Sequence, residues 1–397
     1  MGVLSASSTV EHKRPYLRGV KVLVDGGMDI VPDIYIQPEH QRLCKSKVCP
    51  DTQDIPVIDL RELSNSGNRP KAIAAIGQAC QKWGFFQVTN HGVPVATTEK
   101  MKEVAYEFFE LPVEEKMAYH ATSMSSKMTM YGTSFNPYED KTFDWRDYLR
   151  HSCNPLSEEN VSSWPANPPS YRQATHSTHT FLRFASLHFY KSSKAYSVSV
   201  CTSRETAVNY SEAVGSLCKS LLRALSESLG LSPEFLDAAF GTPNERFLLL
   251  NYYPPCPDPA LALGLSSHSD VGGITILLQD ATSGLQVLND GQWIPVKPLP
   301  GAFVVNVGDQ LQVLSNGKYK SVEHRVVLNS ECPRLSIALF YNPSFNTVVS
   351  PVEELLDESH PPLYKEFTFS DYKKRFYAKL DGKACIRSVQ TTVEASS

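Results

Sequence analysis

The sequence has no long apolar run, no block of basic residues and no closely paired cysteines. No apolar stretch of the 397-residue chain approaches the roughly 18 residues that a bilayer-spanning helix needs, so we expect no membrane partner. The 38 basic and 42 acidic side chains give a net charge of −4 without a lysine or arginine run, which argues against a nucleic-acid partner. The apolar share of 42%, with only 21 glycines and 27 prolines, excludes disordered, collagen-like and coiled-coil proteins.

The nine cysteines are scattered, odd in number and never spaced Cys-x-x-Cys. A disulfide framework or a structural zinc site needs closer pairs, so we interpret these residues as reduced thiols. Residues 1–14 do not have the basic start and apolar core of a secretory signal. We therefore expect a cytoplasmic protein. We also expect a monomer that acts on a small molecule.

Apolar spacing and turn residues divide the chain into six segments. They are an N-terminal arm (1–54), a mixed N-terminal region (55–172), an insertion (173–204), supporting helices (205–243), a strand-rich core (244–345) and a C-terminal helix with its tail (346–397). Helical spacing predicts helices from Pro70 to Gly84 and over about 96–110 and 205–229. Residues 120–170 are rich in aromatic side chains and are expected to be irregular.

Short β-branched runs alternate with Gly, Asn, Asp and Pro turns between residues 245 and 345. Such runs at regular spacing are typical of a sandwich or a jelly roll. The expected fold class is therefore α+β, with a jelly-roll core flanked by helices.

Residues 173–204 differ from the rest of the chain. The segment contains no Asp, Glu, Gly or Pro, carries four positive charges, and has neither helical nor strand periodicity. We interpret it as an insertion before the helix at 205–229.

Three pairs of polar residues in the strand-rich core share one spacing: Asn251 and Tyr253, His268 and Asp270, Arg334 and Ser336. Residues i and i+2 of a strand point to the same face, so each pair can point into one cavity. Buried polar pairs in apolar strands are costly unless a bound group satisfies them.

His268 and Asp270 supply an imidazole and a carboxylate, and His324 is the candidate third ligand. Two histidines and one carboxylate form the facial triad of non-haem Fe(II) oxygenases. The Arg334 guanidinium, with the Ser336 hydroxyl, suits bidentate binding of a carboxylate. A cosubstrate that chelates iron and ends in a carboxylate fits both demands, and 2-oxoglutarate is such a molecule. Each pair alone is more often structural, and the interpretation rests on their combination.

The motifs closely resemble those of plant 2-oxoglutarate- and Fe(II)-dependent dioxygenases. Residues 55 to about 379 carry the resemblance, apart from 173–204, in the motifs 83–92, 251–257, 268–270, 307–310, 314–317, 320–325 and 334–336. Members of the family run almost directly from the equivalent of residue 172 into that of residue 205.

The resemblance implies a double-stranded β-helix core and the non-haem dioxygenase N-terminal region over 55–172. It implies Fe(II) on His268, Asp270 and His324. It also implies that 2-oxoglutarate is held by the residues Asn251, Tyr253, Arg334 and Ser336. O₂ is the second cosubstrate, and ascorbate the expected reductant. The implied reaction is hydroxylation or desaturation coupled to decarboxylation of 2-oxoglutarate to succinate.

The substrate of the resembling enzymes varies. Residues 147–150, Asp-Tyr-Leu-Arg, resemble the salicylate-hydroxylating branch, with Tyr148 and Arg150 as candidate substrate residues. Phe340 matches an aromatic residue that stacks on flavonoid rings. We therefore expect a planar phenolic, either a small acid paired with Arg150 or a flavonoid on Phe340. The alternative for Arg150 is a surface ion pair.

Two further alternatives remain open. A jasmonate-type hormone oxidase would carry arginine where this chain has Leu249, and more arginines in the stretch matching residues 372–377. The other is a binding-only member, inactivated by the insertion at 173–204.

Overall fold

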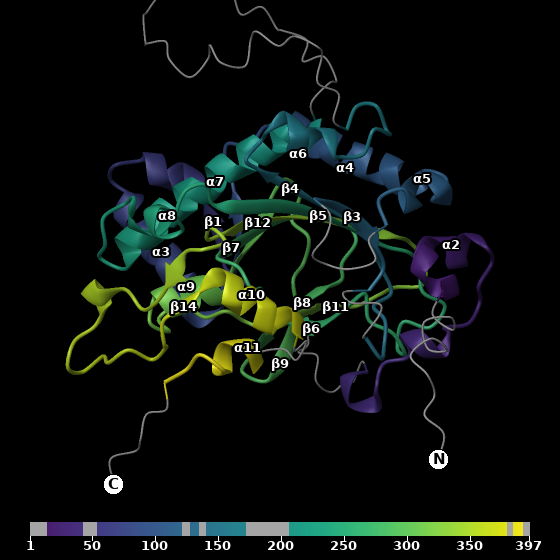
Figure 1. Cartoon of the computed structure of the whole chain (residues 1–397). Helices are drawn as coiled ribbons and strands as arrows, with labels where there is room; N and C mark the ends of the chain where they lie inside the picture. Colours follow the sequence, from purple (N-terminus) through teal and green to yellow (C-terminus); the bar gives the residue numbers. More distant parts are fainter. Residues whose placement is uncertain are drawn as a thin grey trace, which may run out of the picture.

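The described part of the chain forms two facing β-sheets with helices packed outside the larger one (Figure 1). The computed structural model describes residues 14–42, 54–120, 128–134, 140–171, 206–378 and 384–391. The α-helices are α2 (Val20–Asp25), α3 (Arg69–Lys82), α4 (Val95–Glu110), α5 (Val113–Met117), α6 (Glu158–Ser162), α7 (Thr206–Ser228), α8 (Phe235–Ala239), α9 (Asp309–Leu314), α10 (Phe369–Ala378) and α11 (Ala384–Arg387). The 3-10 helices are η1 (Arg14–Arg18), η2 (Asp33–Tyr35), η3 (Glu39–Gln41), η5 (Leu60–Ser64) and η6 (Glu353–Leu355).

The larger sheet has eight strands and the facing sheet four. The order of the larger sheet is β1 (Val57–Asp59), β2 (Phe85–Thr89), β10 (Phe303–Val307), β7 (Ile274–Gln279), β12 (Arg334–Asn342), β5 (Glu245–Tyr253), β4 (Asp147–Asn154) and β3 (Thr129–Gly132). The order of the smaller sheet is β6 (Leu265–His268), β11 (His324–Val326), β8 (Leu285–Asn289) and β9 (Gln292–Pro295). The third sheet of the described residues has two strands, β13 (Val348–Val349) and β14 (Phe367–Thr368).

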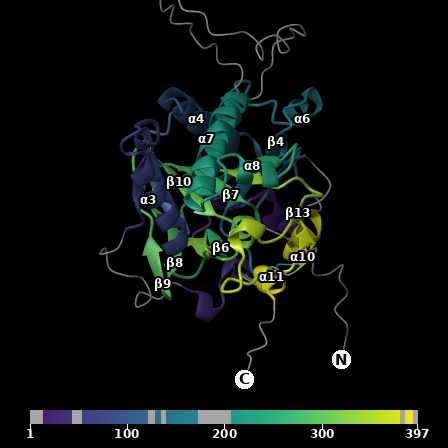
Figure 2. The same ribbon diagram turned by 90° about the vertical axis from the view of Figure 1, so that its left-hand side faces the viewer.

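Helices α3, α4 and α7 cover the outer face of the larger sheet with their apolar sides. Helix α7 buries Val214, Leu217, Leu221 and Leu225, the stripe expected from its spacing. It packs against α3, α4 and β12, and Figure 2 shows α3 and α7 side by side over the strands β7 and β10. This arrangement leaves the inner face of the larger sheet to the smaller sheet.

Helix α3 ends at Lys82, and Gly84, the expected stop signal, follows two residues later. This residue has φ +64°, and a Cβ there would collide with the Lys320 carbonyl oxygen, so only glycine fits. Strand β2 follows directly and pairs with β10 in antiparallel register. The close approach of Gly84 to Lys320 places the segment that leads to His324 beside the beginning of β2.

The expectation of an irregular segment at 120–170 is wrong for three of its parts, which form β3, β4 and α6. Strand β4 pairs with β3 on one side and with β5 on the other. Its burial alternates from Leu149 to Asn154, but the residues at its start are buried on both faces, which hides the period in the sequence. The strand brings Tyr148 and Arg150 onto the inner face of the larger sheet.

The predicted insertion, 173–204, lies outside the described residues. The described residues on either side of it meet, because the Ala207 amide donates to the Tyr171 carbonyl oxygen at 3.3 Å. The six cysteines among the described residues are free thiols, and only Cys332 is exposed. None of the helices in the described ranges combines the length and apolarity that a membrane crossing requires.

Candidate active site

A cavity of about 690 Å³ opens between the two sheets. Its wall is the inner face of β4, β5, β7 and β12, together with β6 and the start of β11. Gln37 and Gln41 of the N-terminal arm also line it, as do Phe376 and Tyr377 of α10. The polar pairs expected from the sequence all line this one cavity.

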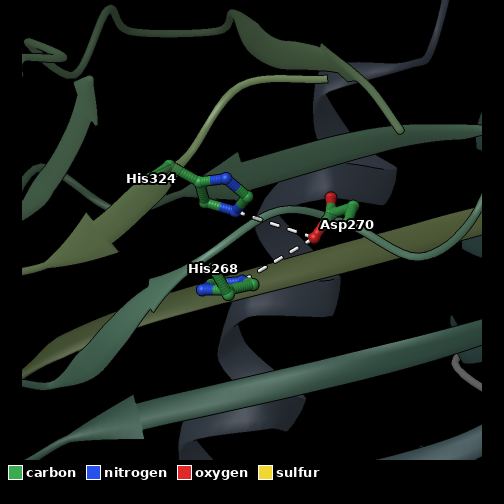
Figure 3. A group of neighbouring side chains, drawn as sticks. All are labelled: His268, Asp270 and His324. Carbon is green, nitrogen blue, oxygen red and sulfur yellow. Dashed lines mark ion pairs between the residues drawn. The ribbon is translucent and has the colours of Figure 1, made fainter. Parts of the chain in front are cut away.

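His268, Asp270 and His324 form a compact cluster at the junction of the two sheets (Figure 3). His268 ends β6 and lies directly opposite His324, the first residue of β11. The Nε2 atoms of the two histidines each lie 3.7 Å from Asp270 Oδ1. All three potential ligand atoms lie within 4.8 Å of one another, which is the spacing that one metal ion can bridge.

The remaining atoms of these three side chains are held by the protein. His268 Nδ1 donates to the Ser266 carbonyl at 2.8 Å, and His324 Nδ1 donates to the Val322 carbonyl at 3.2 Å. Each Nε2 therefore presents a lone pair to the centre of the cluster, as in metal-binding histidines.

Asp270 is oriented in the same way. Its Oδ2 accepts hydrogen bonds from Thr275 Oγ1 at 2.5 Å and from Asn306 Nδ2 at 2.6 Å, which leaves Oδ1 for the centre. Burial alone would raise the pKa of Asp270, but the neighbouring histidines and these two hydrogen bonds lower that pKa overall. Burial, and then the proximity of His324, lowers the pKa of His268, so its imidazole is neutral at pH 7. The charge states suit a divalent cation.

The second polar group lies on neighbouring strands of the larger sheet. Arg334 pairs with Tyr253, and Ser336 with Asn251, so all four side chains share one face of β12 and β5. Arg334 is 2% exposed, and its Nη2 donates to Gln279 Oε1 at 3.1 Å. Its Nε has no hydrogen-bond partner in the described part of the chain. A buried guanidinium with an unsatisfied donor fits a bound carboxylate.

The candidate substrate residues form a stack at the other end of the same face. The Arg150 guanidinium carbon lies 4.3 Å above the centre of the Phe247 ring. Phe247 in turn stacks on Phe340, with ring centres 4.6 Å apart and planes 17° apart. Phe340 is directly opposite Thr275, which donates a hydrogen bond to Asp270. The stack therefore begins beside the group formed by His268, Asp270 and His324.

The structure thus brings all of the predicted site residues to one cavity. Tyr148 also lines the cavity. It lies on β4 between Arg150, on the same strand, and Arg146, the residue that precedes the strand. Three of the residues described above are additions: Phe247, Thr275 and Asn306. Asn306 was detectable as the one polar residue in an apolar strand, and Phe247 as the residue two positions before Leu249 and four before Asn251.

His91 lies in a turn between Asn90 and Gly92, both of which have positive φ. Its Nε2 is 3.0 Å from the Gly301 carbonyl oxygen, and its Nδ1 accepts from the Val93 amide. Both ring nitrogens are used to hold this turn, outside the cavity.

Two family models match the chain. Residues 244–343 match the 2OG-Fe(II) oxygenase superfamily. Residues 55–169 match the model described as non-haem dioxygenase in morphine synthesis N-terminal.

Relatives and solved structures agree with these matches. Protein DMR6-LIKE OXYGENASE 2 of Arabidopsis thaliana is 39% identical over 92% of this chain and 95% of that protein. Flavanone 3-dioxygenase 2 of Oryza sativa subsp. japonica is 39% identical over 91% of this chain and 95% of its own length. The crystal structure of JOX2 in complex with 2OG, Fe and JA superposes with a TM-score of 0.77 at 37% identity, covering 94% of this chain and 97% of JOX2.

The similarities confirm three expectations from the sequence. They confirm the double-stranded β-helix core with its flanking helices. They confirm the use of Fe(II), 2-oxoglutarate and O₂. They also confirm the dioxygenase reaction class. The chain belongs to the plant 2-oxoglutarate- and Fe(II)-dependent dioxygenases.

Proposed function

We propose that His268, Asp270 and His324 bind Fe(II) in this dioxygenase. The support is the convergence of two Nε2 lone pairs and one carboxylate oxygen. Each histidine donates from its Nδ1 to a carbonyl oxygen, and the other oxygen of Asp270 accepts from Thr275. Three protein ligands leave coordination positions open for 2-oxoglutarate and O₂. This donor set matches the facial triad in number, type and charge.

We propose further that 2-oxoglutarate lies between this cluster and Arg334. Arg334 and Ser336 are placed to bind the distal carboxylate, and Asn251 and Tyr253 line the same stretch of wall. The Arg334 guanidinium carbon lies 5.2 Å from the centre of the Tyr253 ring, within the range of a cation–π contact. Within the described residues no Asp or Glu forms an ion pair with Arg334, so its charge is available to the cosubstrate.

When bound, iron, 2-oxoglutarate and O₂ supply the oxidising power: 2-oxoglutarate becomes succinate and CO₂, and the substrate is hydroxylated or desaturated. The protein holds the substrate beside the cluster and excludes bulk water. The apolar rings of the wall, Phe247 and Phe340, suit that task.

The substrate we propose is a planar phenolic acid. The observation that carries this proposal is the continuous stack of Arg150, Phe247 and Phe340 on the cavity wall. An aromatic ring can stack on Phe340 while its carboxylate reaches the guanidinium of Arg150. Within the described residues no Asp or Glu forms an ion pair with Arg150. This observation argues against the alternative that Arg150 forms a surface ion pair.

A flavonoid is the second candidate. The stacked rings and the cavity volume of about 690 Å³ favour it, as does the similarity to a flavanone 3-dioxygenase. A jasmonate-type hormone is less favoured, because Leu249 on the wall is apolar and Arg375 of α10 is exposed. Helix α10 instead presents Phe376 and Tyr377 to the cavity.

Replacement of Arg150 separates these candidates. For a phenolic acid, Arg150→Ala removes a charge-assisted hydrogen bond, so we expect KM for the acid to rise about 10- to 100-fold. Arg150→Lys, which keeps the charge, restores part of this loss. KM is measured for hydroxybenzoic acids, hydroxycinnamic acids, flavanones and jasmonic acid.

The matched control is Arg223→Ala, which removes a surface arginine paired with Glu234. If Arg150→Ala leaves KM for every acidic phenolic unchanged, the acid proposal is wrong. If Phe340→Leu then weakens only the flavanones, the flavonoid candidate takes its place.

A further inference from the structure

Arg146 is a buried arginine on the cavity wall that the proposed reaction does not yet use. It directly precedes β4 and is 2% exposed. Its Nη1 donates to Asn251 Oδ1 at 2.8 Å, and the amide of Asn251 is itself 4% exposed. Its Nε has no hydrogen-bond partner in the part of the chain that the structure describes. This cation lies at the boundary between the cosubstrate wall and the substrate wall.

The guanidinium dictates which way the Asn251 amide faces. Arginine carries only donors, so the atom of Asn251 that faces Arg146 must be the oxygen. The amide nitrogen then faces away from Arg146, and its contact within the described residues is a long one, 3.5 Å to the Leu249 carbonyl. A donor is therefore left for the cavity, where a carboxylate of 2-oxoglutarate is expected.

Arg146 lies beside two neighbours on its own segment, Tyr148 and Asp144. Its guanidinium carbon is 5.3 Å from the centre of the Tyr148 ring. Burial raises the pKa of the Asp144 carboxyl, and the charge of Arg146 offsets part of that rise. Asp144 Oδ1 accepts from the Ser266 amide at 2.9 Å and from its hydroxyl at 2.7 Å. The carbonyl of Ser266 in turn accepts from His268 Nδ1. The segment 144–146 thus joins the strand of the metal cluster to the strand of Asn251.

We propose that Arg146 is a positioning residue that fixes the Asn251 amide with its nitrogen toward 2-oxoglutarate. This inference rests on the proposed cosubstrate site. Without Arg146 the Asn251 amide is free to rotate by 180° about its Cβ–Cγ bond, because its oxygen and nitrogen are nearly equal in size. The turned amide presents its oxygen to the cosubstrate carboxylate, which replaces attraction by repulsion.

The test is the affinity for 2-oxoglutarate without turnover, measured by calorimetric titration of the Mn(II)-loaded protein. Arg146→Met keeps the length of the side chain and removes its donors. We expect the dissociation constant to rise about 10- to 100-fold, the loss typical of one hydrogen bond to a charged group. Arg146→Gln keeps one donor for Asn251 Oδ1 and is expected to recover part of that loss.

A double-mutant cycle with Asn251→Ala isolates the positioning role. Once Asn251 is removed, Arg146→Met should change the dissociation constant by less than about twofold, since its effect passes through that amide. If the two substitutions instead weaken binding additively, Arg146 acts by its charge and the inference is overturned. It is overturned as well if Arg146→Met binds 2-oxoglutarate like the wild type.

Folding and the proposed function are controlled separately. The melting temperature of each variant is measured beside that of Arg223→Met, and Arg146→Gln carries the test if the Met variant does not fold. Failure of wild-type protein to bind 2-oxoglutarate overturns the proposed cosubstrate site, whereas equal binding by wild type and variant overturns only the role of Arg146.

Discussion

At the scale of single residues, the site depends on hydrogen bonds that aim each ligand atom. Thr275 and Asn306 hold Oδ2 of Asp270 and so turn Oδ1 toward the two histidines. Such supporting bonds typically contribute 10- to 100-fold to metal affinity. The geometry of the cluster is therefore a property of its neighbours as much as of the three residues themselves.

This dependence predicts the effect of Thr275→Val. Valine has the shape of threonine but cannot donate to Asp270, so we expect Fe(II) to bind about 10-fold more weakly. Anaerobic Fe(II) titration measures the effect. Thr368→Val is the matched control, because the Thr368 hydroxyl also donates to an aspartate, Asp371 at 2.9 Å, but outside the cavity. Equal Fe(II) affinity in both variants would contradict the role given to Thr275.

The sequence predicts the identity of the site residues better than their supports. Arg334 and Ser336 are visible because a polar pair at i and i+2 is costly in an apolar strand. His268 and Asp270 are visible because, with His324, they complete a set of two histidines and one carboxylate, although Asp270 lies in the loop after β6 and not on a strand. The contacts of Thr275 and Arg146 depend on which strands become neighbours. Strand β7 lies between β10 and β12, and β4 beside β5, and no local pattern specifies that order.

At the scale of elements, helix α7 carries information about the inserted segment. The Ala207 amide donates to the Tyr171 carbonyl across the segment. If Arg172 were joined directly to Glu205, Ala207 would be the fourth residue after Tyr171, which is the spacing of an α-helical hydrogen bond. We propose that residues 173–204 interrupt what is otherwise the first turn of α7.

Deletion of residues 173–204 tests this proposal. We expect the shortened chain to fold and to retain the dioxygenase activity, with a melting temperature equal to or above that of the full chain, since a long loop is costly to close. Thermal melting and succinate formation are measured for both chains. A matched deletion of 32 residues, 206–237, removes all of α7 and the first turn of α8 and should abolish folding. Loss of folding in the first deletion would contradict the interpretation as an insertion.

Helices and strands could be predicted from the sequence where apolar residues recur at a clear spacing, and could not be predicted where residues on both faces of a strand are buried. The stripe of α7 and the strands around Ile274 and Leu335 were predictable, because each buries one face or a short apolar run. Strand β4 was not, since Asp147, Tyr148 and Leu149 at its start are all buried. Asp147 accepts hydrogen bonds from the Val20 and Lys21 amides, contacts that attach the N-terminal arm and leave no local signal.

At the scale of the whole molecule, both sheets of the described part of the chain line the cavity that contains the candidate site. Subtracting the 32 residues of 173–204 from 397 leaves 365 residues. The two sheets contribute different parts of the chemistry. The smaller sheet carries His268 and His324, and the loop after β6 carries Asp270. The larger sheet forms the cavity walls where we propose that the cosubstrate and the substrate bind.

The most direct test of this account is the coupling of 2-oxoglutarate decarboxylation to oxidation of a phenolic acid by the purified full chain. With Fe(II), 2-oxoglutarate, O₂ and ascorbate, mass spectrometry should find one succinate for each product that is heavier by one oxygen atom or lighter by two hydrogen atoms. Asp270→Ala should form neither. The account is contradicted if wild-type protein forms no succinate with any phenolic, or if Asp270→Ala forms it at the wild-type rate.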